Sequence, residues 1–360
     1  MTKVFTITTR GLETISAAEL AAVPGVTIDQ VAYRRILATC RGPLTPLLKL
    51  RTVDDVFLYV TTWGGIGRPR STLDILREAS ARLQLAGFAG LCAQVRALPA
   101  PPTFSVSANF VGRRNYSTPE IKEACAAGIM AGQGWTYSEN DEAAGLNVRL
   151  FVDGDTAVVG VRLGERPLSK RPYKQHNVPG SLKPPVAAAL AALVGVGPGM
   201  RVLDPCCGAG TILIEAKAYQ AEAWGGDVDL RAVKAARINA AAAGEAVLLH
   251  CWDGRALPLA DQSVDRVICN VPWGRAVSTP DTLRALYEGI GAEIQRVLAP
   301  GGQVALLTNR PDLAQLKGLK CDPWTEISLF GQTPTIMVWR DQLYEESSAS
   351  IQSYSRRSHP

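Results

Sequence analysis

The sequence predicts an α/β protein in which a doubly wound sheet, closed by an antiparallel hairpin, follows an α+β region. After Pro198, short runs of Val, Ile and Leu alternate with helical patterns, and these runs lack the polar alternation of half-exposed strands. Only Gly331 and Gln332 separate the last two runs, which leaves no room for a crossover helix, so these runs must pair antiparallel. Before Pro198 the two faces of the predicted strands differ, as is typical of an α+β region.

The strands of the second half are expected to be parallel and buried on both faces, apart from the closing hairpin. The predicted strands are 200–206, 224–229, 246–253, 264–271 and 302–309, followed by the hairpin strands 325–331 and 333–341. The predicted helices are 210–223, 230–244 and 279–302, the last with a Thr-Pro start and a Pro-Gly-Gly end. The tail 347–360 is polar, and we expect it to be disordered.

The first half is expected to bind rather than to catalyse, because it contains no constellation of catalytic side chains. Its expected elements are, in order, a strand, turn and helix over 3–23, strands within 26–40, a Pro-broken helix near 44–51, a strand at 104–113, a helix at 117–132 and a strand pair over 146–163. The last pair is hinged on Asp153-Gly154-Asp155.

Composition indicates a globular protein of two or three domains, because 360 residues exceed one typical domain. No run reaches the roughly 18 to 20 uncharged apolar residues of a membrane helix, and the first residues lack the apolar core of a signal peptide. We therefore expect a cytoplasmic protein with no membrane partner. The eight cysteines form no C-x-x-C pair and only three histidines are present, so we expect reduced thiols, no metal and no histidine-dependent triad.

The chain has a net charge of +5, and a cluster of basic residues lies in its middle. The cluster consists of Arg113, Arg114, Arg162, Arg166, Lys170, Arg171, Lys174 and Lys183, with Tyr116 and Tyr173 among them. By itself this pattern is as consistent with a solvated surface or linker as with the binding of an anionic partner.

The stretch VLDPCCGAGT places Asp204 at a strand end, followed by Gly208 and Gly210 in a turn that precedes a helix. Glycines let the backbone approach a ligand closely, and the start of a helix favours an anionic group. Leu213 stands where a dinucleotide fingerprint has its third glycine, which argues against a pyrophosphate. Asp204 instead suits a ligand that carries an ammonium group beside a carboxylate.

Two further aspartates end the next predicted strands. Asp227 lies where an acidic side chain can bind the two hydroxyls of a ribose, whereas Asp229 is interpreted as a helix cap. Asp253, followed by Gly254, can meet the amino group and ring nitrogens of an adenine. Because parallel strands end at one edge of a sheet, these groups come together there. An amino-acid head, a ribose and an adenine together describe S-adenosylmethionine, which we predict as the cofactor.

The fourth strand ends in Asn270, followed by Val271, Pro272 and Trp273. The amide oxygen of Asn270 and the main-chain carbonyl of Val271 can accept hydrogen bonds from an exocyclic amine as it attacks a sulfonium methyl group. Pro272 fixes the loop, and Trp273 offers a face on which a flat base can stack. The loop predicts methyl transfer to an amine by positioning and electrostatics, without a general base. The alternative is a Pro-Trp loop that only packs.

The motifs DPCCGAGT and NVPWG resemble those of class I methyltransferases that modify amino groups in nucleic acid, whose usual signature is Asn/Asp-Pro-Pro-Tyr/Phe. Val271 and Trp273 depart from that signature, which leaves the substrate open rather than the reaction type. The stretches TTRGLETISAAEL, FSVSANFVGRRNYSTPEIKEACAAGI and LFVDGDTAVVGVRLGERPLSKRPYK resemble the ferredoxin-like and THUMP domains of RNA-modifying enzymes, and SLKPPVAAALAAL resembles the segment leading into their methyltransferase domain. Within that group the chain is most similar to the TrmN-type tRNA guanine-N2 methyltransferases, which act on guanosine 6 of the acceptor stem.

The resemblance implies a domain plan and a set of site residues. The implied plan is a ferredoxin-like domain over 1–60, a THUMP RNA-binding domain over 61–165, a linker over 166–185, a Rossmann-like class I methyltransferase domain over 186–345 and a disordered tail over 346–360. The implied catalytic loop is Asn270, Val271, Pro272 and Trp273. The implied cofactor site is Asp204, Cys206, Gly208, Gly210, Thr211, Asp227, Val228, Asp253, Gly254 and Asn270. The implied RNA-binding residues are Arg113, Arg114, Lys170, Arg171, Tyr173 and Lys174.

The activity implied is formation of N2-methylguanosine in tRNA by a monomer that binds the acceptor stem and 3′ end. Other targets remain open: guanine at another tRNA position or in ribosomal RNA, adenine in DNA or RNA, and the glutamine amide of proteins. The THUMP-like half argues for structured RNA over the last two. A non-catalytic RNA-binding protein that keeps the fold is a further alternative, against which Asp204, Asp227, Asp253 and Asn270 argue.

Overall fold

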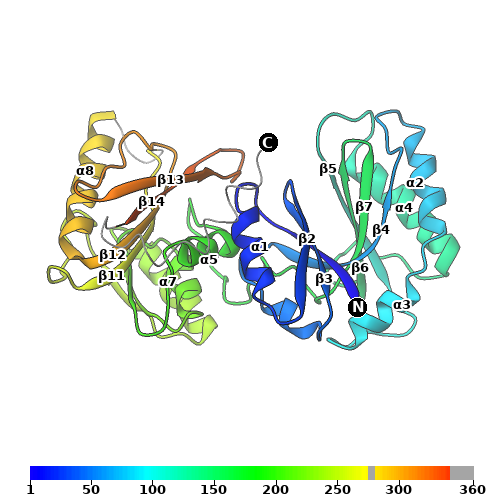
Figure 1. Ribbon diagram of the computed structural model, residues 1–360, viewed down its shortest axis with the longest axis horizontal. Coiled ribbons are helices and arrows are strands. Elements are labelled where there is room, and N and C mark those ends of the chain that lie inside the picture. The colour runs from blue at the N-terminus through cyan, green and yellow to red at the C-terminus, as the bar shows by residue number, and fades with distance from the viewer. Residues whose placement is uncertain (275–279, 341–360) are drawn as a thin grey trace. The chain divides into compact units, whose positions relative to one another are not determined.

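The computed structural model describes residues 1–274 and 280–340, and the chain forms two compact units (Figure 1). The first unit contains Met1–Ile7 and Leu20–Leu168, and the second contains Thr8–Glu19 and the chain from Ser169 onward. Each unit is built around one seven-stranded sheet.

The sheet of the second unit has the predicted doubly wound arrangement. Its strands are β8 (Arg201–Asp204), β9 (Glu222–Asp227), β10 (Leu248–Cys251), β11 (Val264–Asn270), β12 (Leu298–Thr308), β13 (Lys320–Glu326) and β14 (Thr335–Arg340). They lie in the order β10-β9-β8-β11-β12-β14-β13, the first five parallel and β14 antiparallel to both of its neighbours. The strand order changes direction between β8 and β11, and such a switch point is where open α/β sheets bind ligands.

Helices cover both faces of this sheet, which explains why its strands are apolar without alternation. The helices are α5 (Pro184–Leu193), α6 (Thr211–Lys217), α7 (Leu230–Ala243) and α8 (Pro280–Val297). Ile268 lies in a buried cluster with residues of α5 and α6, whereas its neighbour Val267 lies in another with residues of α8. Leu12 and Ile15, at the start of α1 (Glu13–Ala21), join the first cluster, so this amino-terminal segment packs with the second unit.

Three predicted elements of the second unit differ from the structure. The predicted helix 279–302 does not reach Pro-Gly-Gly, because it ends at Val297 and β12 begins at Leu298. The predicted helix 210–223 ends at Lys217, because the chain enters β9 at Glu222. The closing hairpin forms, but β13 begins and ends earlier than the predicted strand 325–331. Its turn is Phe330-Gly331 rather than Gly331-Gln332, because Phe330 and Gly331 have φ of +51° and +75°, the left-handed pair that suits a tight hairpin.

The first unit contains a single mixed sheet, and the predicted domain boundary at residue 60 falls inside one of its strands. The strands are β1 (Thr2–Ile7), β2 (Val26–Ala32), β3 (Arg35–Cys40), β4 (Asp55–Trp63), β5 (Phe104–Phe110), β6 (Leu146–Asp153) and β7 (Thr156–Arg162). Their order is β2-β3-β1-β4-β7-β6-β5, and β5 and β6 pair in parallel. Because β4 pairs with β1 on one side and β7 on the other, it joins both predicted domains into one sheet.

The helical elements of the first unit are η1 (Thr45–Lys49), α2 (Thr72–Ala81), α3 (Ala86–Ala93) and α4 (Thr118–Gln133). A capping box between Ser117 and Glu120 starts α4, and Gly134 in the left-handed region ends it. α2 and α4 pack closely, since a Cβ on Gly132 would lie 2.0 Å from the carbonyl oxygen of Ala81. The sequence did not predict β4, α2 or α3.

The predicted linker 166–185 is incorrect, because most of it belongs to the second unit. That unit includes the chain from Ser169, and α5 begins at Pro184. We call residues 171–183 the strap, since they pack across α6 and α7. The predicted tail and the Thr-Pro start of α8 at residue 279 lie outside the described residues. Among the helices of the described chain, none is both long and apolar enough to span a membrane.

Candidate active site

The turn after β8 requires the glycines that the sequence places there. Gly208 and Gly210 have φ of +52° and +77°, values that other residues rarely adopt. A Cβ on Gly210 would also lie 3.0 Å from the Cβ of Ala236 in α7. Thr211 follows at the start of α6 and is buried. The turn therefore allows α6 to approach α7 directly beside the carboxyl edge of the sheet.

Asp204 ends β8 and is only 1% exposed. Its Oδ1 accepts a hydrogen bond of 3.1 Å from the backbone N–H of Cys206. Burial, with a smaller contribution from the nearby charge of Asp227, raises the pKa of Asp204 to about 8, although the Cys206 N–H opposes this shift. A buried carboxyl group of this kind costs stability until a cation approaches it, which fits the predicted role of binding an ammonium group.

Asp227 ends β9 and links two turns. Its Oδ2 accepts from the N–H of Gly208 at 3.0 Å, and its Oδ1 accepts from the N–H of Asp229 at 3.0 Å. Each carboxylate oxygen has a further lone pair, so the side chain can still accept from two hydroxyl groups. The next residue, Val228, is 75% exposed and presents an apolar surface beside that carboxylate. Asp229 caps α7 through Arg231, as predicted.

Asp253 follows β10 and is held differently from the other two aspartates. Both of its carboxylate oxygens accept from the guanidinium of Arg255, the closest contact being 2.6 Å, and these hydrogen bonds lower the pKa of Asp253. The buried Gly254 keeps the turn close to Pro205. Trp252, which the sequence did not single out, donates from Nε1 to the carbonyl of Pro205 at 3.1 Å and so joins this turn to the turn after β8.

Asn270 ends β11 with its two amide atoms in unlike environments. Nδ2 donates to the carbonyl oxygen of Gly180, in the strap, at 3.0 Å. Oδ1 is buried and has no hydrogen-bond partner among the described residues. An orphaned buried acceptor is costly unless a ligand satisfies it. The bond to Gly180 therefore fixes the orientation of the amide and leaves its oxygen for a donor that the protein does not supply.

The loop after Asn270 is anchored from two sides. The N–H of Val271 donates to Leu307 at 3.2 Å, and the carbonyl of Pro272 accepts from the hydroxyl of Tyr287 at 3.1 Å. Tyr287 is buried in α8 and is also hydrogen-bonded to Thr308 Oγ1 at 2.7 Å. Trp273 is half-buried against the apolar cluster of α5 and α6, so only part of its ring remains for stacking on a base.

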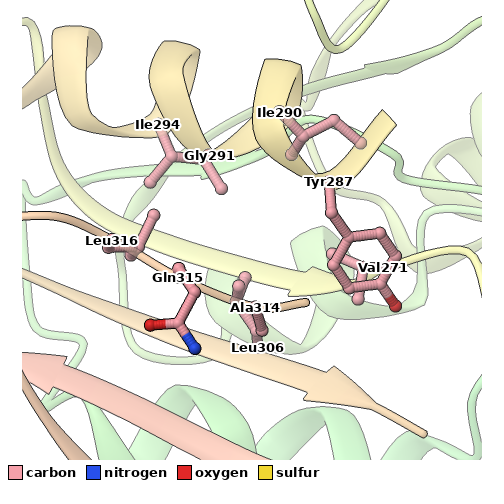
Figure 2. A pocket seen from close by; sticks show the side chains of 9 residues that line it. All are labelled: Val271, Tyr287, Ile290, Gly291, Ile294, Leu306, Ala314, Gln315 and Leu316. Carbon is pink, nitrogen blue, oxygen red and sulfur yellow. The ribbon is translucent and has the colours of Figure 1, made fainter. Parts of the chain in front are cut away.

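A small cavity lies behind this loop, with Tyr287 and Val271 at one side and Leu316 and Ile294 at the other (Figure 2). The cavity is lined by α8, β12 and Val271, and its volume is about 10 Å³. It is therefore comparable to a single water molecule and too small for a cofactor. Tyr287 closes the end nearest Val271, with its ring directed towards the loop.

The strap is held by two buried polar side chains that the sequence reading missed. Glu215 of α6 accepts from the hydroxyl of Tyr173 at 2.7 Å and from Nε of Arg171 at 3.2 Å. Asn239 of α7 accepts from the backbone N–H groups of residues 175 and 176 at 3.0 and 2.9 Å. The available signal was a single acidic or amide group inside an apolar helical stretch. These hydrogen bonds fix the strap against α6 and α7. The strap includes Gly180, whose carbonyl in turn binds the amide of Asn270.

Three of the predicted RNA-binding residues belong to the strap and have structural partners. Tyr173 is buried and Arg171 is paired with Glu215, which argues against the RNA-binding role predicted for each of them. Lys174 donates to Thr211 Oγ1 at 2.8 Å and to the carbonyl of Leu182, and burial lowers its pKa to about 8. Lys174 thus supports the turn of the predicted cofactor site.

The other three predicted RNA-binding residues are more accessible. Arg113 and Lys170 are exposed. Arg114 is half-buried and donates to the carbonyl groups of Ile66, Gly67 and Gly154, which gives it a structural role. Only part of the predicted basic cluster is therefore available at the surface.

S-adenosylmethionine fits this edge in its chemistry. The buried carboxyl of Asp204 suits an ammonium group, and Asp227 retains acceptors for ribose hydroxyls beside the exposed Val228. The predicted contact of Asp253 with the adenine fits less simply, because the guanidinium of Arg255 already donates to both of its carboxylate oxygens. Among the described residues, no group of three or more His, Cys, Asp and Glu side chains is arranged to hold a metal ion.

We expect Asp204→Asn to stabilise the ligand-free protein. The folded-state pKa of Asp204 lies above its unfolded value, so ionisation costs folding stability as pH rises from about 4 and fully so above about 8. Relative to the variant, the parental protein should lose about 2 to 4 kcal/mol of unfolding free energy between pH 5 and pH 8. Urea unfolding of the parental protein and the variant at both pH values measures this difference. If the two unfolding free energies change equally with pH, Asp204 is not a buried carboxyl group with a raised pKa.

The carboxyl edge of the second unit lies in a region with recognisable relatives. Residues 171–330 match the sequence pattern of a family described as the RMKL-like methyltransferase domain. A tRNA (guanine(6)-N2)-methyltransferase of Thermus thermophilus is 36% identical over 215 residues, which cover 59% of this chain and 63% of that protein. A U6 snRNA (guanine-N(2))-methyltransferase of Mus musculus is 31% identical over 217 residues, which cover 57% of this chain and 38% of that protein. The chain thus spans less than two thirds of the length of these relatives.

Solved structures share the fold over nearly the whole chain. TrmN from Thermus thermophilus aligns with a TM-score of 0.74 over 95% of this chain and 100% of that chain, at 29% identity. A possible methylase from Clostridium difficile 630 aligns with a TM-score of 0.72 over 94% of this chain and 98% of that chain, at 20% identity. The predicted class I methyltransferase fold, with S-adenosylmethionine as its cofactor, is confirmed. The stretch that matches the RMKL-like methyltransferase domain, residues 171–330, includes the strap.

Proposed function

We propose that this protein is an S-adenosylmethionine-dependent tRNA (guanine-N2)-methyltransferase. The observation that carries the proposal is the buried, unpartnered Oδ1 of Asn270. The Nδ2 of the same amide donates to the Gly180 carbonyl, at the edge that also carries Asp204 and Asp227. The similarity to guanine-N2 methyltransferases supports guanine as the target base.

The chemistry requires a poor nucleophile to be activated in place. When bound at this edge, S-adenosylmethionine supplies an electrophilic methyl group. The Asn270 Oδ1 and the Val271 carbonyl accept the two hydrogens of the guanine 2-amino group and direct its lone pair outward. Positive charge develops on that nitrogen during attack, so both hydrogen bonds strengthen in the transition state. The methylated nitrogen then releases one of its two protons to solvent, which leaves neutral N2-methylguanosine. Because the loop is anchored through Tyr287 and Leu307, the acceptors need little reorganisation.

The finer assignments form part of the same proposal. Guanosine 6 of the acceptor stem is the proposed site, since a relative named for that position is 36% identical in the matched region. The first unit is proposed to be the ferredoxin-like and THUMP region that binds the tRNA 3′ end. We further propose a cytoplasmic monomer that needs no metal.

Ribosomal RNA is the competing substrate, because a ribosomal RNA large subunit methyltransferase K/L is 29% identical over 231 residues. Methyl transfer to purified tRNA and to ribosomal RNA, assayed side by side, separates the two.

Asn270→Ala should lower turnover by a factor of about 100 to 1,000, because one preorganised acceptor is lost from the transition state. Affinity for S-adenosylmethionine, measured by calorimetry, should be largely retained. The assay is single-turnover methyl transfer to tRNA with RNA and cofactor saturating, and Asn115→Ala, an exposed amide in the first unit, is the matched control. Transfer at the parental rate by the Asn270 variant would refute the proposed mechanism.

Tyr287→Phe should loosen the catalytic loop by removing the hydroxyl that joins Pro272 to Thr308. Since Tyr287 acts through the loop, we expect kcat to fall about 10-fold while KM for tRNA changes little. Tyr219→Phe is the matched control, because Tyr219 donates to Ala188 in the same unit. Tyr287 does not position the loop if the variant loses activity only through a higher KM for tRNA. The same holds if kcat falls as much in the Tyr219→Phe control.

A further inference from the structure

The first unit carries a guanidinium group whose charge is not balanced by a neighbouring carboxylate. Arg149 of β6 is half-buried, and its Nη2 donates to Asn109 Oδ1 of β5 at 2.7 Å. Its Nε is buried without an acceptor, and within the described ranges no carboxylate lies at ion-pair distance from it. A buried donor and an unpaired charge are both costly, so this side chain needs an external partner.

Arg162, on the adjacent strand, forms ion pairs with the carboxylates nearest to Arg149. Its Nε lies 2.7 Å from Asp55 and its Nη1 lies 2.9 Å from Asp141. Asp141 also accepts from Ser105 and Asn147. The two acids of this region are therefore already engaged. Burial, together with the like charges of Arg162 and Arg34, lowers the pKa of Arg149 to about 10, although the charges of Asp55 and Asp141 oppose this shift.

The hairpin between β2 and β3 brings further positive charge to the same face. Arg35 places its guanidinium 5.2 Å from the centre of the Phe151 ring, which lies two residues from Arg149 on β6. Arg34 has φ of +56°, in the left-handed region where hairpin turns ordinarily use glycine or asparagine. Retaining arginine there costs backbone strain, and such strain is common at functional positions. The neighbouring Tyr33 is 44% exposed.

We propose that Arg149 and Arg34 bind a phosphate group of the RNA substrate on this face of the first unit, with Tyr33 beside it as a surface for an unstacked base. The site rests on the RNA methyltransferase function proposed above. The planar fork of arginine matches the oxygens of a phosphodiester, and an anion there would satisfy Arg149 while relieving the repulsion between the two guanidinium groups. Aromatic side chains beside a basic surface are typical of proteins that bind single-stranded RNA.

The test uses the full chain and a tRNA transcript, with affinity measured by fluorescence anisotropy over a series of salt concentrations. Arg34→Gly is the principal variant, because glycine tolerates the turn and should keep or raise the melting temperature. We expect its Kd for tRNA to rise about 5- to 10-fold and the slope of log K against log salt to fall by about 1. Arg149→Gln, which can keep a hydrogen bond to Asn109, should show the same loss. Arg82→Ala, at an exposed arginine that directly follows α2, should change neither quantity.

The outcomes separate this site from the proposed function. Both variants should keep the parental kcat at saturating tRNA, because the loss lies in RNA binding. Unchanged affinity and slope in both Arg34→Gly and Arg149→Gln would overturn the site, even if methyl transfer proceeds. Absence of methyl transfer by the parental protein would overturn the proposed function, while the binding experiment still decides the site. Loss of affinity for a polyglutamate peptide without loss for tRNA would instead reassign this face to an acidic protein.

Discussion

The hydrogen bond from the Asn270 amide nitrogen to the Gly180 carbonyl decides which atom of that side chain faces the reaction. Without it, the amide has no fixed orientation and either end can face the ligand. The bond depends on the strap, and the strap depends on Glu215 and Asn239, two buried polar groups on helices beside the glycine turn. The catalytic acceptor is therefore oriented by a chain of contacts that begins on α6 and α7, the helices that also form the predicted cofactor site.

At the carboxyl edge of the second sheet, buried polar groups lack some favourable partners, and a bound ligand would provide them. Asp204 is buried with a raised pKa, and the Asn270 Oδ1 lacks a donor among the described residues. Away from this edge, charged groups of the same unit have partners: Asp229 caps α7, and Arg296 is held by Glu293 and Asp261. This contrast is the physical reason for placing chemistry at the edge, because stability is sacrificed where binding can recover it.

The local part of this arrangement could be predicted from the sequence. Asp204, Asp227 and Asn270 end strands, and Asp253 follows β10 by two residues. Because parallel strands end at one edge, the pattern alone brings the four together. Contacts between distant segments could not be predicted in this way. Gly180 and Asn270 are 90 residues apart, and Arg171 and Tyr173 looked like surface residues because their partner Glu215 lies on a helix 42 or more residues away. β4 was missed, and with it the continuity of the first sheet, because that continuity depends on pairing between strands far apart in sequence.

The central claim is that the Asn270 and Val271 acceptors hold the 2-amino group of a guanine for methylation. Its most direct test is methyl transfer from labelled S-adenosylmethionine to a tRNA in which the guanosine that receives the label is replaced by inosine, which lacks only that amino group. The account predicts N2-methylguanosine in the parental tRNA and no transfer to that position of the inosine-containing tRNA. Undiminished transfer to the inosine-containing position, or a methyl group on any other atom of the base, would contradict it.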